Sequence, residues 1–330
     1  MTNIALDVMG GDNCPDINID GAYDALNMLK DIHIKLVGPE ERIEKAIASW
    51  DKSLKDRVTI VDANEVISTE ESPVKALRAK PDSSIVRGLK LVKEGEADAF
   101  ISAGSTGAIL AGGQLIVGRL KGVLRTPLAT MIPTRKGFTL FLDCGANVDA
   151  KPEWLQQFAV MGSIYMDKVQ DKPGAVVKLV NLGTEEEKGN ALTKAANQLL
   201  NDTEGINYQG FIESRDVVTG AADIVVADAF TGNAIIKTYE GTADMLFSLI
   251  KEVLKSGLAT RIAALLIMKP LKEKLKEFDV AKCGGAILLG LRGVVVKCHG
   301  NAKRGEIAMA IEKAAKYVSE DVNGIIEKAM

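Results

Sequence analysis

Residues that build metal sites are scarce in this chain of 330 residues. It has only two histidines and four cysteines. The cysteines, Cys14, Cys144, Cys283 and Cys298, show no C-x-x-C spacing, so we expect no structural zinc site and no bound metal. Such sparse and unpaired cysteine usage is typical of a protein in a reducing compartment.

Long apolar runs and an excess of basic residues are also missing. The longest apolar run, residues 262–268, is far shorter than the roughly 20 residues that a membrane-spanning helix needs. The chain begins with a strand-like segment, residues 4–8, without the basic flank of a secretory signal. The net charge is −3 with 26% charged residues, which does not favour nucleic-acid binding. We expect a cytoplasmic protein.

The common nucleotide and hydrolase motifs are absent as well. No G-x-G-x-x-G follows a predicted strand, and the chain contains neither a Gly-Lys dipeptide nor H-E-x-x-H, so we expect no P-loop and no cofactor. The segment Ala103-Gly104-Ser105-Thr106-Gly107 nearly matches the nucleophile elbow G-x-S-x-G. A hydrolase triad would then need His299 and an aspartate such as Asp228, but the same turn is equally suited to binding phosphate.

Short apolar runs alternate with helical patterns from end to end, which predicts βα units and a mostly parallel sheet. We predict a three-layer α/β/α fold over residues 1–330, as one unit or with two lobes. The predicted strands are 4–8, 33–38, 58–62, 97–102, 126–132, 137–143, 175–181, 208–213, 223–228 and 293–298. The predicted helices are 16–30, 39–50, 83–94, 104–120, 152–168, 188–202, 231–255 and 303–328.

One segment, residues 251–278, is positively charged in an otherwise acidic chain, with seven lysines and arginines against three glutamates, an excess of four. Pro270 predicts a break in its helical pattern. We predict a protruding helical hairpin at about residues 241–280. It is either a subunit interface or a face packed on the core, or it contacts a membrane surface or an acidic partner. Its apolar stripe is Leu258, Ile262, Leu265 and Leu266, followed by Leu271, Leu275 and Phe278.

The segment around residues 223–233 is the strongest candidate for chemistry. An apolar strand ends at Asp228, and Thr231, Gly232 and Asn233 follow at the predicted start of a helix. Free backbone N–H groups at a helix N-terminus favour an anion such as phosphate. Alternatively, Thr231 or Asn233 only caps the helix.

Four other predicted strand ends have the same combination of glycine and small polar residues. Because the carboxyl ends of parallel strands share one edge of a sheet, we expect all five turns to form one anion-binding crevice there. The residues concerned are Gly10, Gly11, Asp12, Gly104, Ser105, Thr106, Gly107, Asn147 and Thr184.

Lys188 stands at the beginning of the predicted helix 188–202. A cation there opposes the helix dipole, which suggests that it binds an anionic ligand. An ion pair with Glu185 is the alternative explanation.

Taken together, these segments resemble the bacterial PlsX family of phosphate acyltransferases over nearly the whole chain. The matching motifs are Asp7-Val8-Met9-Gly10-Gly11-Asp12, Ser102-Ala103-Gly104-Ser105-Thr106-Gly107-Ala108, Asp143-Cys144-Gly145-Ala146-Asn147-Val148-Asp149-Ala150-Lys151-Pro152, Asn181-Leu182-Gly183-Thr184-Glu185 with Lys188-Gly189-Asn190, Phe230-Thr231-Gly232-Asn233, and His299-Gly300.

The resemblance implies transfer of a fatty acyl group from acyl carrier protein to inorganic phosphate, giving an acyl phosphate for glycerol-3-phosphate acylation. It also implies a homodimer with a fold similar to isocitrate and isopropylmalate dehydrogenases and phosphotransacetylases, peripherally bound to the membrane near the glycerol-3-phosphate acyltransferase. The family's proposed catalytic lysine and asparagine fall on Lys188 and Asn233. Substrate contacts are expected at the glycine turns, Thr231, Gly232 and His299.

A few positions depart from the family pattern. Asn13 and Cys14 stand where the family more often has His-Ala, Ser105 where asparagine is common, Cys144 where valine is common, and Lys282-Cys283-Gly284-Gly285 where a tyrosine often precedes the two glycines. Because the family uses no serine nucleophile at position 105, the hydrolase hypothesis is weakened. Two other hypotheses stay open: a dehydrogenase of the isocitrate type, and a lipid-responsive scaffold without catalysis.

Overall fold

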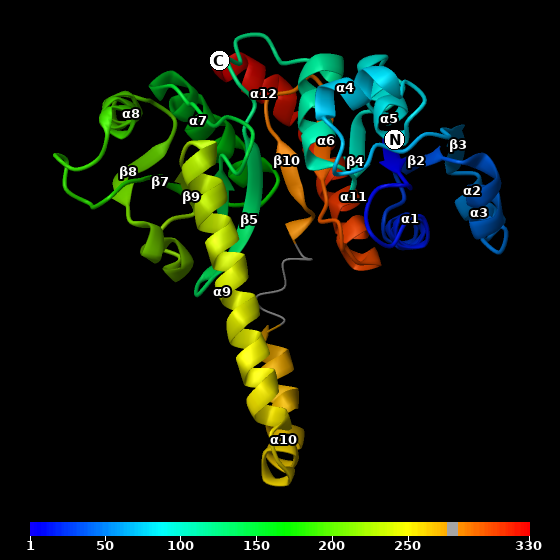
Figure 1. Ribbon diagram of the computed structural model, residues 1–330. Helices are drawn as coiled ribbons and strands as arrows, with labels where there is room; N and C mark the ends of the chain where they lie inside the picture. Colours follow the sequence, from blue (N-terminus) through cyan, green and yellow to red (C-terminus); the bar gives the residue numbers. More distant parts are fainter. Residues whose placement is uncertain (276–282) are drawn as a thin grey trace.

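The computed structural model describes residues 1–275 and 283–330. Helices flank a central sheet, and a long helical hairpin projects from it (Figure 1). Among the described residues the sheet has eleven strands in the order β3-β2-β1-β4-β11-β10-β5-β6-β9-β7-β8. The strands are β1 Thr2–Asp7, β2 Ile32–Gly38, β3 Val58–Asp62, β4 Ala99–Ser102, β5 Leu128–Thr134, β6 Gly137–Leu142, β7 Val176–Val180, β8 Asn207–Ile212, β9 Ile224–Val226, β10 Ala286–Leu288 and β11 Val294–Lys297.

The predicted mostly parallel α/β fold is confirmed, and all ten predicted strands are present. Strand β10 is not predicted from the sequence, because three residues beside two glycines give too short a pattern. Pairing is antiparallel for β11 with β10, β10 with β5, and β5 with β6, and parallel elsewhere. As a result, β6, β9, β7 and β8 run opposite to β3, β2, β1, β4 and β11.

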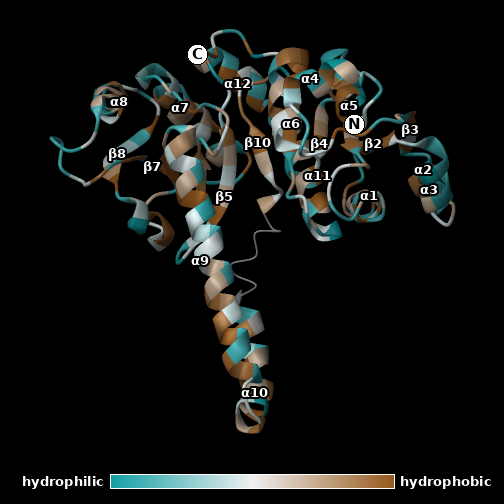
Figure 2. Cartoon of the chain, in the orientation of Figure 1, coloured by the Kyte–Doolittle hydropathy of each residue, from teal (hydrophilic) through white to brown (hydrophobic). Residues whose placement is uncertain are grey.

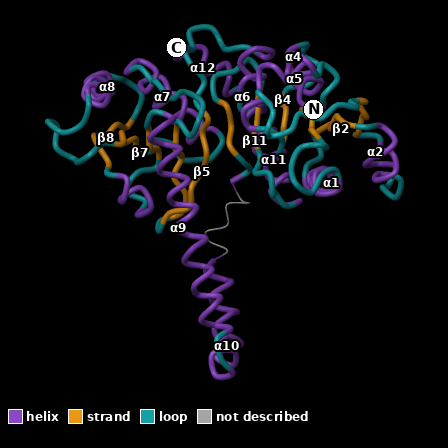
Figure 3. The backbone as a smooth tube through the Cα atoms, in the orientation of Figure 1, coloured by secondary structure: helices purple, strands orange, loops and turns teal. Residues whose placement is uncertain are grey.

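Helices cover both faces of the sheet, as alternate residues of each buried strand show. In β6, Leu140 and Leu142 pack in the cluster that includes α7, whereas Phe141 packs on the other face with Ile236 of α9. One face is covered by α1, α7, α8, α11 and α12, and the other by α4, α5, α6 and α9 (Figure 3). The helices are α1 Asp16–Met28, α2 Glu40–Ile47, α3 Lys52–Lys55, α4 Pro73–Ala79, α5 Ser84–Lys93, α6 Thr106–Gly112, α7 Pro152–Lys168, α8 Ala191–Asn201, α9 Ala229–Lys255, α10 Leu258–Leu275, α11 Arg304–Ser319 and α12 Val322–Ala329, with a π-helix η1 at Gly113–Val117 and a 3-10 helix η2 at Ser214–Thr219.

The helical hairpin consists of the second half of α9 and all of α10. The predicted break at Pro270 is wrong, because α10 continues through this proline to Leu275. Water can satisfy the carbonyl that loses its N–H partner on such an exposed helix. Phe278 lies outside the described residues. Apolar residues occur along both helices (Figure 2), and several of their side chains are exposed. Among the described residues, no helix has the length and apolar character of a membrane span.

Candidate functional site

The predicted site residues lie at two different edges of the sheet. The carboxyl ends of β1, β4 and β11 form what we call the first edge, and those of β6, β9 and β7 form the second edge. The antiparallel β5–β6 hairpin reverses the strand direction between the two groups. The expectation of a single edge is therefore wrong, because it assumed that every strand runs the same way.

At the first edge, the turns after β1 and β4 are in close contact. A Cβ atom on Gly10 would lie 2.5 Å from the backbone nitrogen of Gly104, so only glycine fits there. The buried carboxylate of Asp7 accepts hydrogen bonds from the Met9 N–H and the Ser102 hydroxyl, at 2.9 and 2.6 Å. Asp7 therefore fixes both turns.

Lys297, at the end of β11, is a first-edge cation that the sequence analysis missed. Its ammonium group donates to the carbonyl oxygens of Ala103 and Cys298, and burial lowers its pKa. A lysine in an alternating strand pattern gives no local sign of such a role. Lys297 ties the turn after β4 to the turn after β11.

His299 and Ser105 do not form the triad of the hydrolase hypothesis with Asp228. Ser105 is buried and caps α6, accepting from the Ala108 N–H at 3.5 Å. His299 Nε2 lies 3.9 Å from Glu240 Oε1 of α9. Asp228 lies at the second edge, so the three groups are not brought together.

At the second edge, α9 begins two residues earlier than predicted, at Ala229, and is capped by Asp228. The Asp228 carboxylate accepts from both the N–H and the hydroxyl of Thr231, at 2.9 and 2.7 Å, and the Ala229 N–H donates to Asn147 O at 3.0 Å. Neither Thr231 nor Asn233 is the cap. The N–H groups of Ala229 and Thr231, which we expected to face an anion, therefore donate hydrogen bonds within the chain.

Gly232 and Asn233 have different environments at the start of α9. A Cβ on Gly232 would lie 2.0 Å from the carbonyl oxygen of Asp143, so this glycine lets α9 pack against the end of β6. Asn233, one residue later, is exposed. Its side chain is accessible to a ligand.

Asp143 organises the turn after β6. One of its buried carboxylate oxygens accepts the N–H groups of Leu128, Gly145 and Ala146, and the other accepts the backbone N–H and side-chain amide of Asn147, all at 2.7–3.1 Å. Burial raises the pKa of Asp143, against the effect of these hydrogen bonds. The Asn147 amide also donates to Thr126 O, so Asn147 supports the turn.

We expect Asp143→Asn to lower thermal stability, because an amide NH₂ in place of one oxygen leaves at least one buried donor unsatisfied. Each such donor costs about 1–3 kcal/mol, which corresponds to a melting temperature lower by several degrees. The measurement is thermal unfolding followed by circular dichroism. The exposed Asp149→Asn is the control, and equal melting temperatures of the two variants would contradict the role of Asp143.

Lys188 lies in the loop between β7 and α8, not in a helix as predicted. Helix α8 begins at Ala191, after Asn190 accepts from the Thr193 N–H as its cap. The Lys188 ammonium lies 2.7 Å from Glu185, and both side chains are about half exposed. Their hydrogen bond raises the pKa of Lys188 and lowers that of Glu185. Thr184, on the same loop, is exposed.

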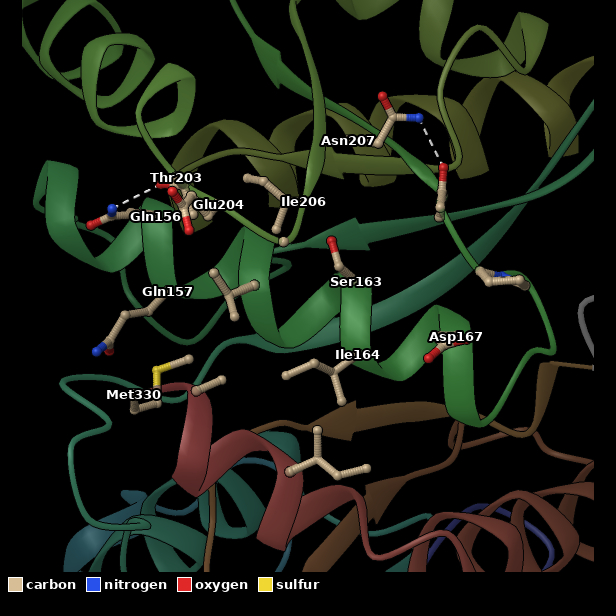
Figure 4. Close-up of a pocket in the computed structure, with 17 residues that line it drawn as sticks. Gln156, Gln157, Ser163, Ile164, Asp167, Thr203, Glu204, Ile206, Asn207 and Met330 are labelled. Carbon is tan, nitrogen blue, oxygen red and sulfur yellow. Dashed lines mark hydrogen bonds between the residues drawn. The ribbon is translucent and has the colours of Figure 1, made fainter.

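A cavity of about 660 Å³ lies elsewhere, on the face of the sheet covered by α7 (Figure 4). It is lined by α7, the loop before β8 and the end of α12, and includes Gln156, Thr203 and Met330. Gln156 donates to the Thr203 hydroxyl at 2.8 Å. None of the predicted site residues lines this cavity.

A family model, several named proteins and solved structures each match nearly the whole chain. The family model described as "Fatty acid synthesis protein" matches residues 2–324. A protein of Clostridium beijerinckii named phosphate acyltransferase is 47% identical over 97% of this chain and 96% of its own length, and one of Clostridium botulinum with the same name is 46% identical over 98% of both. A phosphotransacetylase structure from Streptococcus pyogenes covers 96% of this chain and 94% of its own, with a TM-score of 0.60 and 19% identity. The last likeness concerns the fold alone.

Proposed function

The chain belongs to the fatty acid synthesis protein family, the PlsX family of phosphate acyltransferases, and from this premise we propose that it transfers a fatty acyl group from the thioester of acyl carrier protein to inorganic phosphate. The products are an acyl phosphate and the free thiol of the carrier. The observation that supports this most directly is that Lys188 and Asn233 are both exposed and follow the neighbouring strands β7 and β9, Lys188 in the loop after β7 and Asn233 in the first turns of α9 after β9.

The proposed reaction needs few catalytic groups. Phosphate at neutral pH is already an anionic nucleophile, so attack on a thioester requires no strong general base and no covalent enzyme intermediate. The site must hold phosphate beside the thioester carbonyl and stabilise the negative charge that develops on the carbonyl oxygen. In our proposal, the Lys188 ammonium neutralises charge and the Asn233 amide donates to the oxyanion.

The second edge fits these two roles better than the first. Leu179 of β7 pairs with Val226 of β9, and the Lys188 loop and the turn into α9 leave the sheet just beyond this pair. The Asp228 cap fixes the start of α9, and Asn181 fixes the Lys188 loop by donating to the carbonyl oxygens of Gly183 and Lys188, at 3.2 and 3.0 Å. Both segments are therefore held by buried or partly buried hydrogen bonds, while the proposed catalytic groups face solvent.

The assay that tests the proposal is release of free thiol from acyl-acyl carrier protein on addition of phosphate. Release that depends on phosphate supports the transferase. Growth of the reduced nicotinamide absorbance with a 2-hydroxy acid, without thiol release, would instead identify a dehydrogenase. Lipid binding with neither activity would identify a scaffold.

We also propose that the hairpin makes a homodimer and holds it on the cytoplasmic face of the membrane, close to the glycerol-3-phosphate acyltransferase that uses the product. Met245, Leu246, Leu249 and Val253 are each at least half exposed along one side of α9, an apolar stripe suited to a second copy. On α10, Leu258, Ile262, Leu265 and Leu266 are also exposed, beside Arg261 and Lys269. Such a combination suits anionic lipid or the acidic carrier protein.

We expect Leu258→Glu to weaken co-sedimentation with anionic phospholipid vesicles by about tenfold or more, since a leucine side chain gains about 1.5–3 kcal/mol on burial. Leu258 is 77% exposed, so the substitution should leave the fold and the mass in solution unchanged. Met28→Glu, an exposed position on α1, is the matched control. Undiminished vesicle binding by Leu258→Glu would exclude this membrane contact.

A further inference from the structure

Two large apolar side chains stand beside the proposed catalytic groups at the second edge. Leu182 is 82% exposed and Phe230 is 71% exposed, more than any other large apolar residue outside the hairpin in the described chain except Met1. Burial of each of these side chains would stabilise the protein by about 1.5–3 kcal/mol. One exposed leucine needs no explanation, but two such apolar side chains just after neighbouring strands do.

Leu182 lies in the turn that contacts the side chain of Lys188. A Cβ on Gly183, the residue after Leu182, would lie 2.6 Å from Cδ of Lys188, so the backbone at Gly183 packs against the lysine side chain. The backbone before Leu182 is fixed by the hydrogen bond from the Asn181 N–H to Ile212 O at 3.0 Å. The exposure of Leu182 therefore belongs to an anchored turn.

Phe230 is adjacent to Asn233 on α9. The two residues are three positions apart, which places them on the same side of the helix. Hydrogen bonds of Ala229 with Asn147 and of Thr231 with Asp228 fix the backbone on both sides of Phe230. The apolar ring thus lies beside the amide that we assign to the oxyanion.

We propose that Leu182 and Phe230 bind the fatty acyl chain of the thioester next to the reacting carbonyl and so determine preference for long chains. This inference rests on the proposed function, because the chain must lie beside the carbonyl that phosphate attacks. Glu185, Glu186 and Glu187 lie on the Lys188 loop itself, and Glu213 also raises the pKa of Lys188 through its charge, which disfavours an acidic protein surface at this place. An uncharged hydrocarbon chain has no such penalty.

The test compares wild type with the double variant Leu182→Ser/Phe230→Ser, using palmitoyl and butyryl esters of acyl carrier protein in the phosphate-dependent thiol release assay. We expect kcat/KM for the palmitoyl substrate to fall by about 10–100-fold, the range for lost apolar contacts in a specificity pocket, and for the butyryl substrate by less than about threefold. Met28→Ser, an exposed apolar position on α1, should change neither value. Equal losses for both chains, or no loss for palmitoyl, would overturn the inference.

Binding without phosphate separates this inference from the proposed function. By calorimetry, wild type should bind palmitoyl carrier at least about tenfold more tightly than the double variant does, the smallest gain expected from burying one such side chain. If wild type shows this difference but no phosphate-dependent thiol release, the proposed function fails and the acyl contact stands. If the two proteins bind palmitoyl carrier equally, the acyl contact is wrong, whatever the turnover.

Discussion

Asn233→Ala is expected to lower the turnover of phosphate-dependent thiol release by about 10²–10³-fold, the usual cost of removing one oxyanion donor. The fold should be unaffected, because Asn233 is exposed and the start of α9 is held by Asp228, Gly232 and Ile236 instead. The measurement is steady-state kinetics with acyl carrier protein thioester, together with thermal unfolding.

Two further variants make the Asn233 result specific. Asn233→Asp keeps the shape of the side chain but places a carboxylate beside phosphate, so its loss should be at least as large as that of Asn233→Ala. Asn201→Ala removes an exposed asparagine at the end of α8 and should leave turnover unchanged. Normal turnover by Asn233→Ala would remove Asn233 from the mechanism.

For Lys188→Ala we expect kcat/KM for phosphate to fall by about 10–150-fold, through a higher KM together with a lower kcat. A hydrogen bond to a charged group contributes about 1.5–3 kcal/mol, and each 1.4 kcal/mol corresponds to a factor of ten. Substitution also leaves Glu185 without its cation, and this carboxylate would then repel phosphate. The double variant Lys188→Ala/Glu185→Gln should therefore lose less than Lys188→Ala alone.

The pKa shifts give this prediction a pH dependence. Glu185 raises the pKa of Lys188. The Lys188 ammonium therefore stays charged at every pH below the usual lysine pKa of about 10.4. Phosphate KM in the wild type should therefore be nearly constant between about pH 7 and 9, once allowance is made for phosphate ionisation. Lys194→Ala, an exposed lysine of α8, serves as control. A normal phosphate KM in Lys188→Ala would assign Lys188 a structural role.

Regular elements and their order could be predicted because their signals are local. The run Ile224-Val225-Val226 predicts a buried strand whatever surrounds it, and the pattern of 152–168 gave the bounds of α7. The first residue of a helix is harder to predict. Asp228 rather than Thr231 caps α9, and Asn190 rather than a preceding residue caps α8, since several polar residues in a row can each serve as cap and packing selects among them.

The sequence by itself determined the α/β class, the hairpin and the family, because periodicity and the order of motifs are visible without any knowledge of tertiary contacts. Only the tertiary structure decided that the glycine turns lie at two edges, that Lys297 joins two of them, and that Leu182 and Phe230 are both exposed at the second edge. Strand direction depends on pairing between segments far apart in the chain. The β5–β6 hairpin is a local connection, but the pairing of β6 with β9 and of β9 with β7, which builds the second edge, joins segments far apart in the chain.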